Sequence, residues 1–126
     1  MILIDRSVPR SIASALKMVR RDVLWLEDVF IFRNDTKERE WLQCVGQAGW
    51  LAISRDKKII SRPAERQTIT DAKVGMFVFT QKADPTKWEY LKLLAMNLDA
   101  MEDKFVEVPR PFIYGIQKDG KLRKIA

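Results

Sequence analysis

Four short apolar runs, separated by stretches with helical spacing, constrain the fold of this chain more than any other feature. The runs are ILI (2–4), the centre of DVLWLED (22–28), WLAIS (50–54) and MFVFT (76–80). Each run is too short for a helix and almost continuous in apolar residues, which is typical of a strand buried on both faces of a sheet. We therefore expect a mostly parallel sheet of four to five strands, covered by helices on both faces in a three-layer α/β/α domain.

Helix signals fill the segments between the runs. The expected helix starts are Ser7 acting as an N-cap, NDT (34–36), Pro63 and a position near Pro85. Gly49 is placed to end the second helix, and Trp88 falls on the apolar face of the fourth. KDG (118–120) indicates a hairpin or a strand with a tail. No repeat or linker is visible, so residues 1–126 are expected to form a single domain.

The composition excludes several kinds of chemistry. The chain has no histidine and a single cysteine, Cys44. Ser-His-Asp and Cys-His catalysis, histidine metal ligands and internal disulfides are therefore ruled out. Hydrolytic chemistry would have to use carboxylates, lysines or hydroxyls. Any metal site built from oxygen ligands would suit a hard cation such as Mg²⁺ or Mn²⁺.

Charge and hydropathy narrow the expected surroundings and partners. No apolar run approaches the roughly 18 residues that a membrane helix needs, and the N-terminus lacks the pattern of a secretory signal. We expect a cytoplasmic protein with no membrane partner. The formal net charge of +6 is compatible with a polyanionic partner such as RNA.

Two of the apolar runs end in a carboxylate. Asp5 follows the first run and Asp56 the third, while Glu38 lies near the start of the intervening helix. Open parallel sheets bind ligands outside the carboxyl ends of their strands, so these acids could share one edge. There they could bind one or two divalent cations and activate water for displacement at phosphorus. An Asp after a strand is also a common cap or turn former, and the spacing leaves both interpretations open.

The chain is cationic around this edge. The cations within twelve residues are Arg55, Lys57, Lys58, Arg62 and Arg66. They could follow an RNA backbone and neutralise a reacting phosphate, or they could form a solvated loop and helix face. Glu65 is expected to pair with Arg62 or Arg66.

Three stretches resemble the PIN-domain nucleases, and more closely the short PIN-like proteins grouped with VapC-type toxins. The stretches are ILIDRSVP (2–9), KEREWLQCVGQAGWLAISRDKKI (37–59) and SRPAE (61–65). The resemblance covers roughly residues 1 to 80 and implies a PIN-like fold with endoribonuclease activity that depends on Mg²⁺ or Mn²⁺. It also implies that the protein is the toxin half of a toxin–antitoxin pair, with an antitoxin protein as its partner. Such toxins often form homodimers, and the long helix from about 85 to 103 could form the dimer interface.

The resemblance implies a role for each residue that matches the family pattern. The catalytic residues and metal ligands would be Asp5, Glu38 and Asp56. Ser7 and Ser54 would orient these carboxylates or a water molecule. The residues placed to contact RNA would be Arg55, Lys57, Lys58 and Arg62.

Two departures from the family pattern leave a second class of function open. The family usually has Asp at the position of Glu38, and Asp35 could compensate as an additional ligand. The acidic residue that full-length PIN domains place in an earlier helix has no clear match. The alternative is a catalytically inactive PIN-like module that binds RNA or a protein partner. A response-regulator-like domain is disfavoured, because no acidic pair lies near Asp5.

Overall fold

Six strands form one sheet in the part of the chain that the computed structural model describes, which is residues 1–29 and 37–126. They are β1 (Ile2–Ile4), β2 (Val23–Trp25), β3 (Leu51–Ser54), β4 (Gly75–Phe79), β5 (Phe112–Ile116) and β6 (Leu122–Lys124). Their order across the sheet is β2-β1-β3-β4-β5-β6. The first five pair in parallel, and β6 pairs antiparallel with β5. The sheet is mostly parallel as predicted, but the C-terminal hairpin makes it one strand wider than expected.

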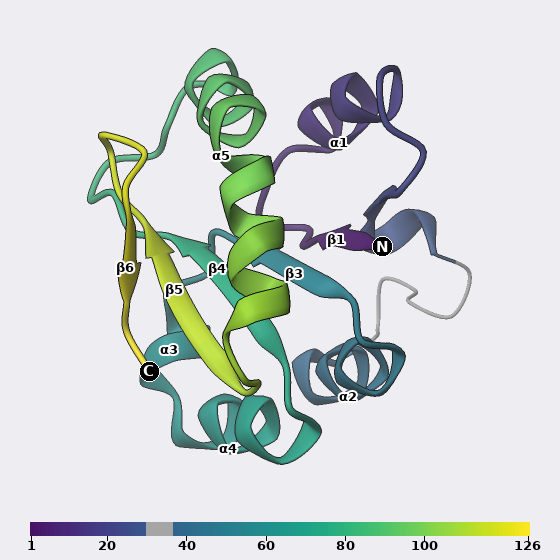
Figure 1. The fold of residues 1–126 in the computed structure, drawn as a ribbon, viewed down its shortest axis with the longest axis vertical. Coiled ribbons are helices and arrows are strands. Elements are labelled where there is room, and N and C mark those ends of the chain that lie inside the picture. Colours follow the sequence, from purple (N-terminus) through teal and green to yellow (C-terminus); the bar gives the residue numbers. More distant parts are fainter. Residues whose placement is uncertain (30–36) are drawn as a thin grey trace.

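Helices cover both faces of the sheet (Figure 1). They are α1 (Arg10–Lys17), α2 (Glu38–Ala48), α3 (Lys58–Ser61), α4 (Pro63–Ala72) and α5 (Lys87–Glu107), with a short 3₁₀ turn, η1, at Leu26–Asp28. Helices α1 and α5 pack on one face, while α2, α3 and α4 pack on the other. The three-layer α/β/α architecture is therefore confirmed. Among the described residues, no helix combines the length and apolarity that a membrane crossing needs.

Strands β1 to β5 are almost continuously apolar because they supply side chains to two cores. Ile4 and Ile53 belong to the core under α1 and α5. Their sequence neighbours Leu3 and Ala52 belong to the core under α2, α3 and α4. Successive side chains of a strand point to opposite faces, so neither face can be polar.

The predicted cap at Ser7 is wrong. Helix α1 begins at Arg10 with Pro9 before it, and its N-terminus has no side-chain cap. The Ser7 hydroxyl instead donates to the carboxylate of Asp5, at 2.7 Å. A cap needs the Ser7 oxygen as an acceptor, but that oxygen accepts from the N–H of Arg55 at 2.8 Å, and α1 begins three residues later. The predicted NDT cap and Asp35 lie outside the described residues.

The predicted burial of Trp88 is also wrong, since 68% of this residue is exposed. Helix α5 buries a stripe that includes Tyr90, Leu94, Leu98 and Met101. Trp88 lies in the first turn of α5, two residues before that stripe begins, and two residues correspond to about 200° around a helix. Trp25 and Trp41 are buried.

Gly46 sets the spacing between α2 and α4. A Cβ atom at this position would lie 2.2 Å from the backbone oxygen of Ala72, a separation that no side chain tolerates. Backbone atoms on both sides make the contact rigid. The two helices can approach this closely only because residue 46 has no side chain.

We expect the substitution Gly46→Ala to lower the free energy of unfolding by about 1 to 3 kcal/mol, because overpacking outweighs the gain in helix propensity. Urea denaturation measures this free energy. Gln47→Ala, at the exposed neighbouring position, is the control and should stay within about 0.5 kcal/mol of the wild type. Equal stability of Gly46→Ala and the wild type would mean that α2 and α4 do not pack as described.

Candidate functional site at the carboxyl edge of the sheet

Asp5 and Asp56 follow two neighbouring strands at the same edge of the sheet. Asp5 comes directly after β1, and Asp56 lies two residues after the end of β3. β1 and β3 pair in parallel, so their carboxyl ends meet. The chain leaves β1 through α1 on one face and leaves β3 through α4 on the other. Such a divergence is a topological switch point, where open α/β sheets bind their ligands.

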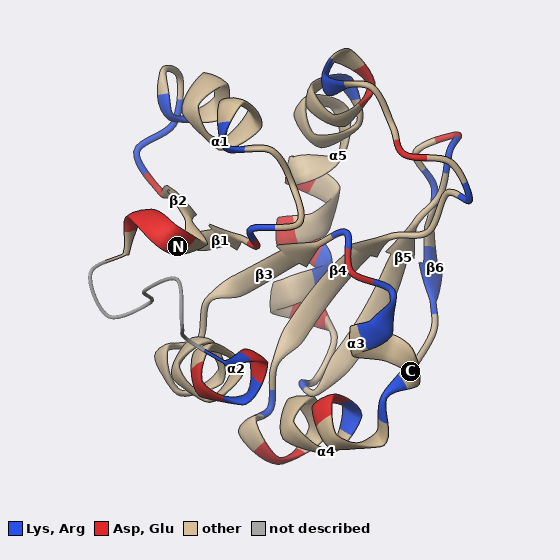
Figure 2. Ribbon diagram, turned by 180° about the vertical axis from the view of Figure 1, so that it is seen from behind, with Lys and Arg blue, Asp and Glu red and all other residues tan. Residues whose placement is uncertain are grey.

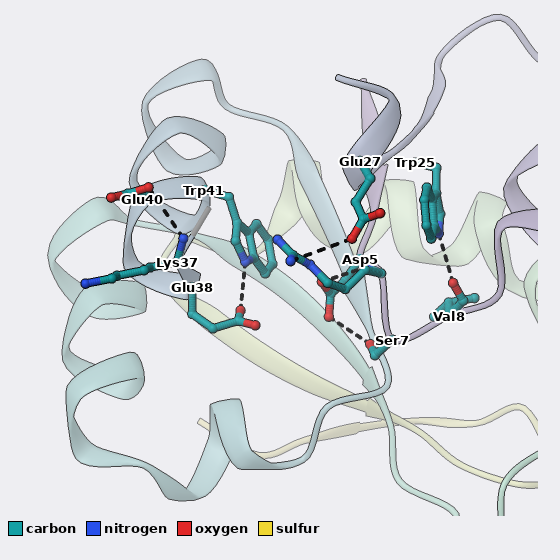
Figure 3. A network of polar contacts seen from close by, with 10 residues as sticks. Asp5, Ser7, Val8, Trp25, Glu27, Lys37, Glu38, Glu40 and Trp41 are labelled. Atoms are coloured by element: carbon teal, nitrogen blue, oxygen red, sulfur yellow. Dashed lines mark hydrogen bonds and ion pairs between the residues drawn. The ribbon is translucent and has the colours of Figure 1, made fainter. Parts of the chain in front are cut away.

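Asp5 is a buried carboxylate held by three hydrogen bonds, and Figure 3 shows the one from the Ser7 hydroxyl. It is only 1% exposed. Its Oδ2 accepts from the hydroxyls of Ser7 at 2.7 Å and Ser54 at 2.9 Å, and its Oδ1 accepts from the Arg6 N–H at 2.8 Å. Burial raises the pKa of Asp5, and the bonds from Ser7 and Ser54 oppose that rise. The hydrogen bonds therefore fix the orientation of the side chain, while its burial disfavours the ionised form of the carboxylate.

The two serines join the ends of β1 and β3. Ser7 Oγ accepts from the N–H of Arg55 at 2.8 Å, and Ser54 Oγ accepts from the N–H of Asp56 at 3.0 Å. Both hydroxyls donate to Oδ2 of Asp5. Each serine therefore accepts a hydrogen bond from a backbone N–H and donates one to the same carboxylate oxygen. These hydrogen bonds connect the loop after β3 to the loop after β1.

Asp56 takes part in a turn as well as facing the edge. Its Oδ1 accepts from the N–H of Lys58 at 2.9 Å, at the start of α3. This contact is the turn-forming role that the sequence left open for an Asp after a strand. The second carboxylate oxygen of Asp56 is not needed for that turn.

Glu38 brings a third carboxylate to the same edge. It is the first residue of α2, and its Oε2 accepts from the indole N–H of the fully buried Trp41 at 2.7 Å (Figure 3). Burial and, to a smaller extent, the negative charges of Asp5 and Asp56 together raise the pKa of Glu38 to about 7, against the lowering effect of the Trp41 hydrogen bond. Charges act on one another in this way only when they are near. The three acids therefore share one electrostatic environment.

The donor set has the chemistry of a hard-cation site. Carboxylate oxygens are the ligands that Mg²⁺ and Mn²⁺ prefer, and a divalent cation would relieve the mutual repulsion of Asp5 and Glu38. Within residues 1–29 and 37–126, however, no three acidic or cysteine side chains are gathered tightly enough to hold one ion together. The assignment of Asp5, Glu38 and Asp56 as joint ligands stays a prediction.

Most of the cations predicted to contact RNA have partners within the protein. Arg55 pairs with Asp84, and its side chain is only 16% exposed. Lys57 Nζ donates to the backbone oxygen of Gln81 at 2.6 Å. Figure 2 shows basic and acidic residues close together at the entry to α3. These two contacts brace the loop between β4 and α5 against the loop after β3.

The remaining two predicted RNA contacts differ from each other. Arg62 pairs with Glu65 at 3.7 Å, which confirms the predicted pairing of Glu65. Lys58 is exposed.

Sequence reasoning missed the residues on the other side of Glu38. A groove of about 700 Å³ opens there, and its lining includes Arg6, Lys37, Glu38 and Arg39. Lys37 and Arg39 flank Glu38 in the sequence, and this KER pattern was the available signal. Trp41 was predicted to be buried, but its hydrogen bond to Glu38 was not predicted.

Glu38 should make the stability of the metal-free protein depend on pH. Its pKa is about 7 in the folded state against 4.5 in the unfolded chain, so its neutral form is favoured by folding. This contribution is complete below pH 4.5 and is lost as the pH rises through 7. Because Glu38 is half-buried, we expect the loss to be about 1 to 2 kcal/mol, less than the full shift implies.

Urea denaturation of the wild type and of Glu38→Gln in EDTA, at pH 4.5 and 7.5, measures this effect. The stability of Glu38→Gln relative to the wild type should rise with pH. Glu40→Gln, which removes an exposed carboxylate from the same turn of α2, is the matched control. The same pH trend in both variants would contradict the assignment to Glu38.

Ser54 should contribute to stability through Asp5. Ser54→Ala removes a donor from a buried carboxylate and leaves the Asp56 N–H without its acceptor. We expect a loss of about 1 to 3 kcal/mol at pH 7 in thermal or urea unfolding. Ser61→Ala, where an exposed hydroxyl makes a long 3.5 Å contact, should change stability by less than about 0.5 kcal/mol. A loss in both variants alike would argue against a special role for Ser54.

Comparison with known protein families agrees with this architecture. A family model described as a PIN like domain matches residues 1–81, which span β1 to β4 and contain Asp5, Glu38 and Asp56. No curated protein and no solved structure gave a match. PIN-like domains are generally nucleases. With the larger part of its length covered by that model, the chain belongs to the PIN-like domain family.

Proposed function

We propose that this protein is a metal-dependent endoribonuclease that hydrolyses RNA at the edge formed by Asp5, Glu38 and Asp56. The observation that carries the proposal is the electrostatic convergence of these acids, which come from three separate parts of the chain. Folding destabilises the charge on Asp5 and Glu38. A site where folding brings negative charges together at a topological switch point is suited to bind a cation and, through that cation, a phosphate group.

The residues of the edge would divide the work between them. Ser7 and Ser54 fix the direction of Asp5 through Oδ2, so Oδ1 keeps acceptor capacity beside the single bond from Arg6. Trp41 holds Glu38 through Oε2. The ligands would be Asp5, Glu38 and Asp56. When bound, Mg²⁺ or Mn²⁺ would supply an activated water and stabilise charge developing at phosphorus.

The toxin of a toxin–antitoxin pair is the biological role that we propose for this activity. It is supported by the resemblance of the stretches 2–9, 37–59 and 61–65 to short PIN-like proteins of the VapC class. An antitoxin protein would then be the partner that restrains the nuclease. A homodimer and a cytoplasmic location belong to the same proposal.

A catalytically inactive PIN-like module that binds RNA or a protein is the second candidate. The absence of a three-acid cluster among the described residues favours it. So does the use of an Asp56 oxygen in the turn before α3. The two candidates differ in whether RNA is cut or only bound.

RNA cleavage with and without Mn²⁺ separates these candidates. The wild type should cut single-stranded RNA only with the metal, and Asp5→Asn should reduce the rate on the order of 100-fold or more. Mn²⁺ should also raise the melting temperature of the wild type and leave that of Asp5→Asn unchanged. Asp103→Asn, an exposed acid on α5, is the control and should behave as the wild type.

One outcome would count against the assigned site and another against the nuclease. Mn²⁺-dependent cutting that survives Asp5→Asn combined with Asp56→Asn would mean that the site lies elsewhere. RNA binding without cutting, retained in those variants, would support the inactive module.

A further inference from the structure

A continuous groove runs from Glu38 along the surface between α2 and α4. Its first part, of about 700 Å³, begins beside Glu38. A second part, of about 490 Å³, shares Arg39, Ala64 and Thr68 with the first and continues between the helices. The shared lining makes the two parts one feature, which we name the α2–α4 groove. One end of it opens at the acidic edge of the sheet.

The two helices give the groove polar walls and a shallow floor. On α2, the residues Arg39, Gln43 and Gln47 recur every four positions and so form one stripe. Gln67 lies on the α4 side. The stripe from Arg39 to Gln47 is about 12 Å long at 1.5 Å per residue, which matches a stack of about three nucleotides at ~3.4 Å each.

The lining of the groove carries the cations Arg6, Lys37 and Arg39 and the acids Glu38, Glu40, Glu65 and Asp71. Glu65 forms an ion pair with Arg62, whereas Glu38, Glu40 and Asp71 accept hydrogen bonds from neutral groups, which do not cancel their charge. In the part of the chain that the structure describes, the side-chain nitrogens of Lys37 and Arg39 have no such partner, and both residues are exposed. An incoming anion would therefore meet two available positive charges next to Glu38.

The lining favours RNA over a peptide as the occupant. A bound helix or strand of a partner protein needs apolar pockets for its anchors. Among the described residues, the lining of the α2–α4 groove contains no apolar side chain larger than alanine. Cations suit phosphates, and glutamine amides can bond to base edges or riboses of an unpaired strand.

We infer that the α2–α4 groove holds the RNA strand on one side of the phosphate to be cut. Lys37 and Arg39 contact the phosphates nearest Glu38, and Gln43 and Gln47 contact the nucleotides beyond them. This inference rests on the proposed function for its substrate. It moves the main RNA contact away from Arg55, which pairs with Asp84, and Lys57, which donates to the backbone oxygen of Gln81.

Binding without cleavage tests the groove separately from the nuclease. A fluorescent single-stranded RNA of about 12 nucleotides is titrated in EDTA, and its anisotropy is followed over a range of salt concentrations. The double variant Lys37→Ala/Arg39→Ala should weaken binding about tenfold and reduce the slope of log K against log salt by about 1.4, for two lost phosphate contacts on a single strand. Gln43→Ala/Gln47→Ala should weaken binding about threefold with an unchanged slope.

The matched control is Lys82→Ala/Lys118→Ala. It removes the same charge from a different groove, lined by the loop after β4 and the turn after β5. This variant should bind RNA within about twofold of the wild type. A loss equal to that of Lys37→Ala/Arg39→Ala would overturn the inference, and so would unchanged binding by the Lys37→Ala/Arg39→Ala variant.

Crosslinking gives a second measurement that does not depend on the variants folding normally. RNA containing 4-thiouridine, crosslinked to the wild-type protein, should label peptides of α2 and α4. Labelling confined to residues 80–85 and 117–118 would overturn the inference. Neither experiment uses metal or measures cutting, so both remain interpretable if the protein proves not to be a nuclease. If instead RNA does not bind in the groove, the expected effect of Asp5→Asn on cleavage is unchanged.

Discussion

The parallel pairing of β1 with β3 is the contact on which the candidate site depends. It brings residues almost fifty positions apart to one edge and lets Ser7 and Ser54 share one carboxylate oxygen of Asp5. A buried carboxylate is costly unless it is fully hydrogen-bonded, and here strand order supplies the donors. The same pairing carries Asp56 to the edge through the Ser54 hydroxyl. Fold and site are therefore one arrangement, and a shift of register between the two strands would disrupt both.

The basic residues near the edge fall into two groups with different physical roles. Arg55 and Lys57 fasten the loop after β4 to the loop after β3. Lys37 and Arg39 lie on the exposed start of α2, on the opposite side of Glu38. The first group stabilises the scaffold, and the second faces a groove. Net positive charge in a sequence does not distinguish these roles, since the distinction depends on which acids lie within reach after folding.

Much of the fold could be read from the sequence because burial on both faces leaves a simple pattern. The apolar runs at 2–4 and 50–54 marked β1 and β3, and Gly49 marked the end of α2. The edge that carries Asp5 and Asp56 followed from the parallel order of the strands. These features depend on local composition and on general rules of sheet topology, so one sequence is sufficient for them.

What could not be read depends on contacts between distant residues. The helix-cap rule assigned Ser7 to α1, since it takes no account of a competing N–H from a distant part of the chain. The pairing of Arg55 with Asp84 spans 29 positions and has no local signature. Trp88 has the spacing of a core residue, but the stripe that α5 buries begins just after it. The α2–α4 groove is lined by residues of two separate helices, which a linear pattern does not display.

The two serines also determine how protons can move at this edge. Each has one hydroxyl proton, and each directs it at Asp5 while its oxygen receives a backbone amide. The hydroxyl oxygens of Ser7 and Ser54 also lie 3.3 Å apart, close enough for one to donate to the other. While both donate to Asp5, neither serine supplies a proton to a departing group, and that proton would come from solvent or from an acid outside this network.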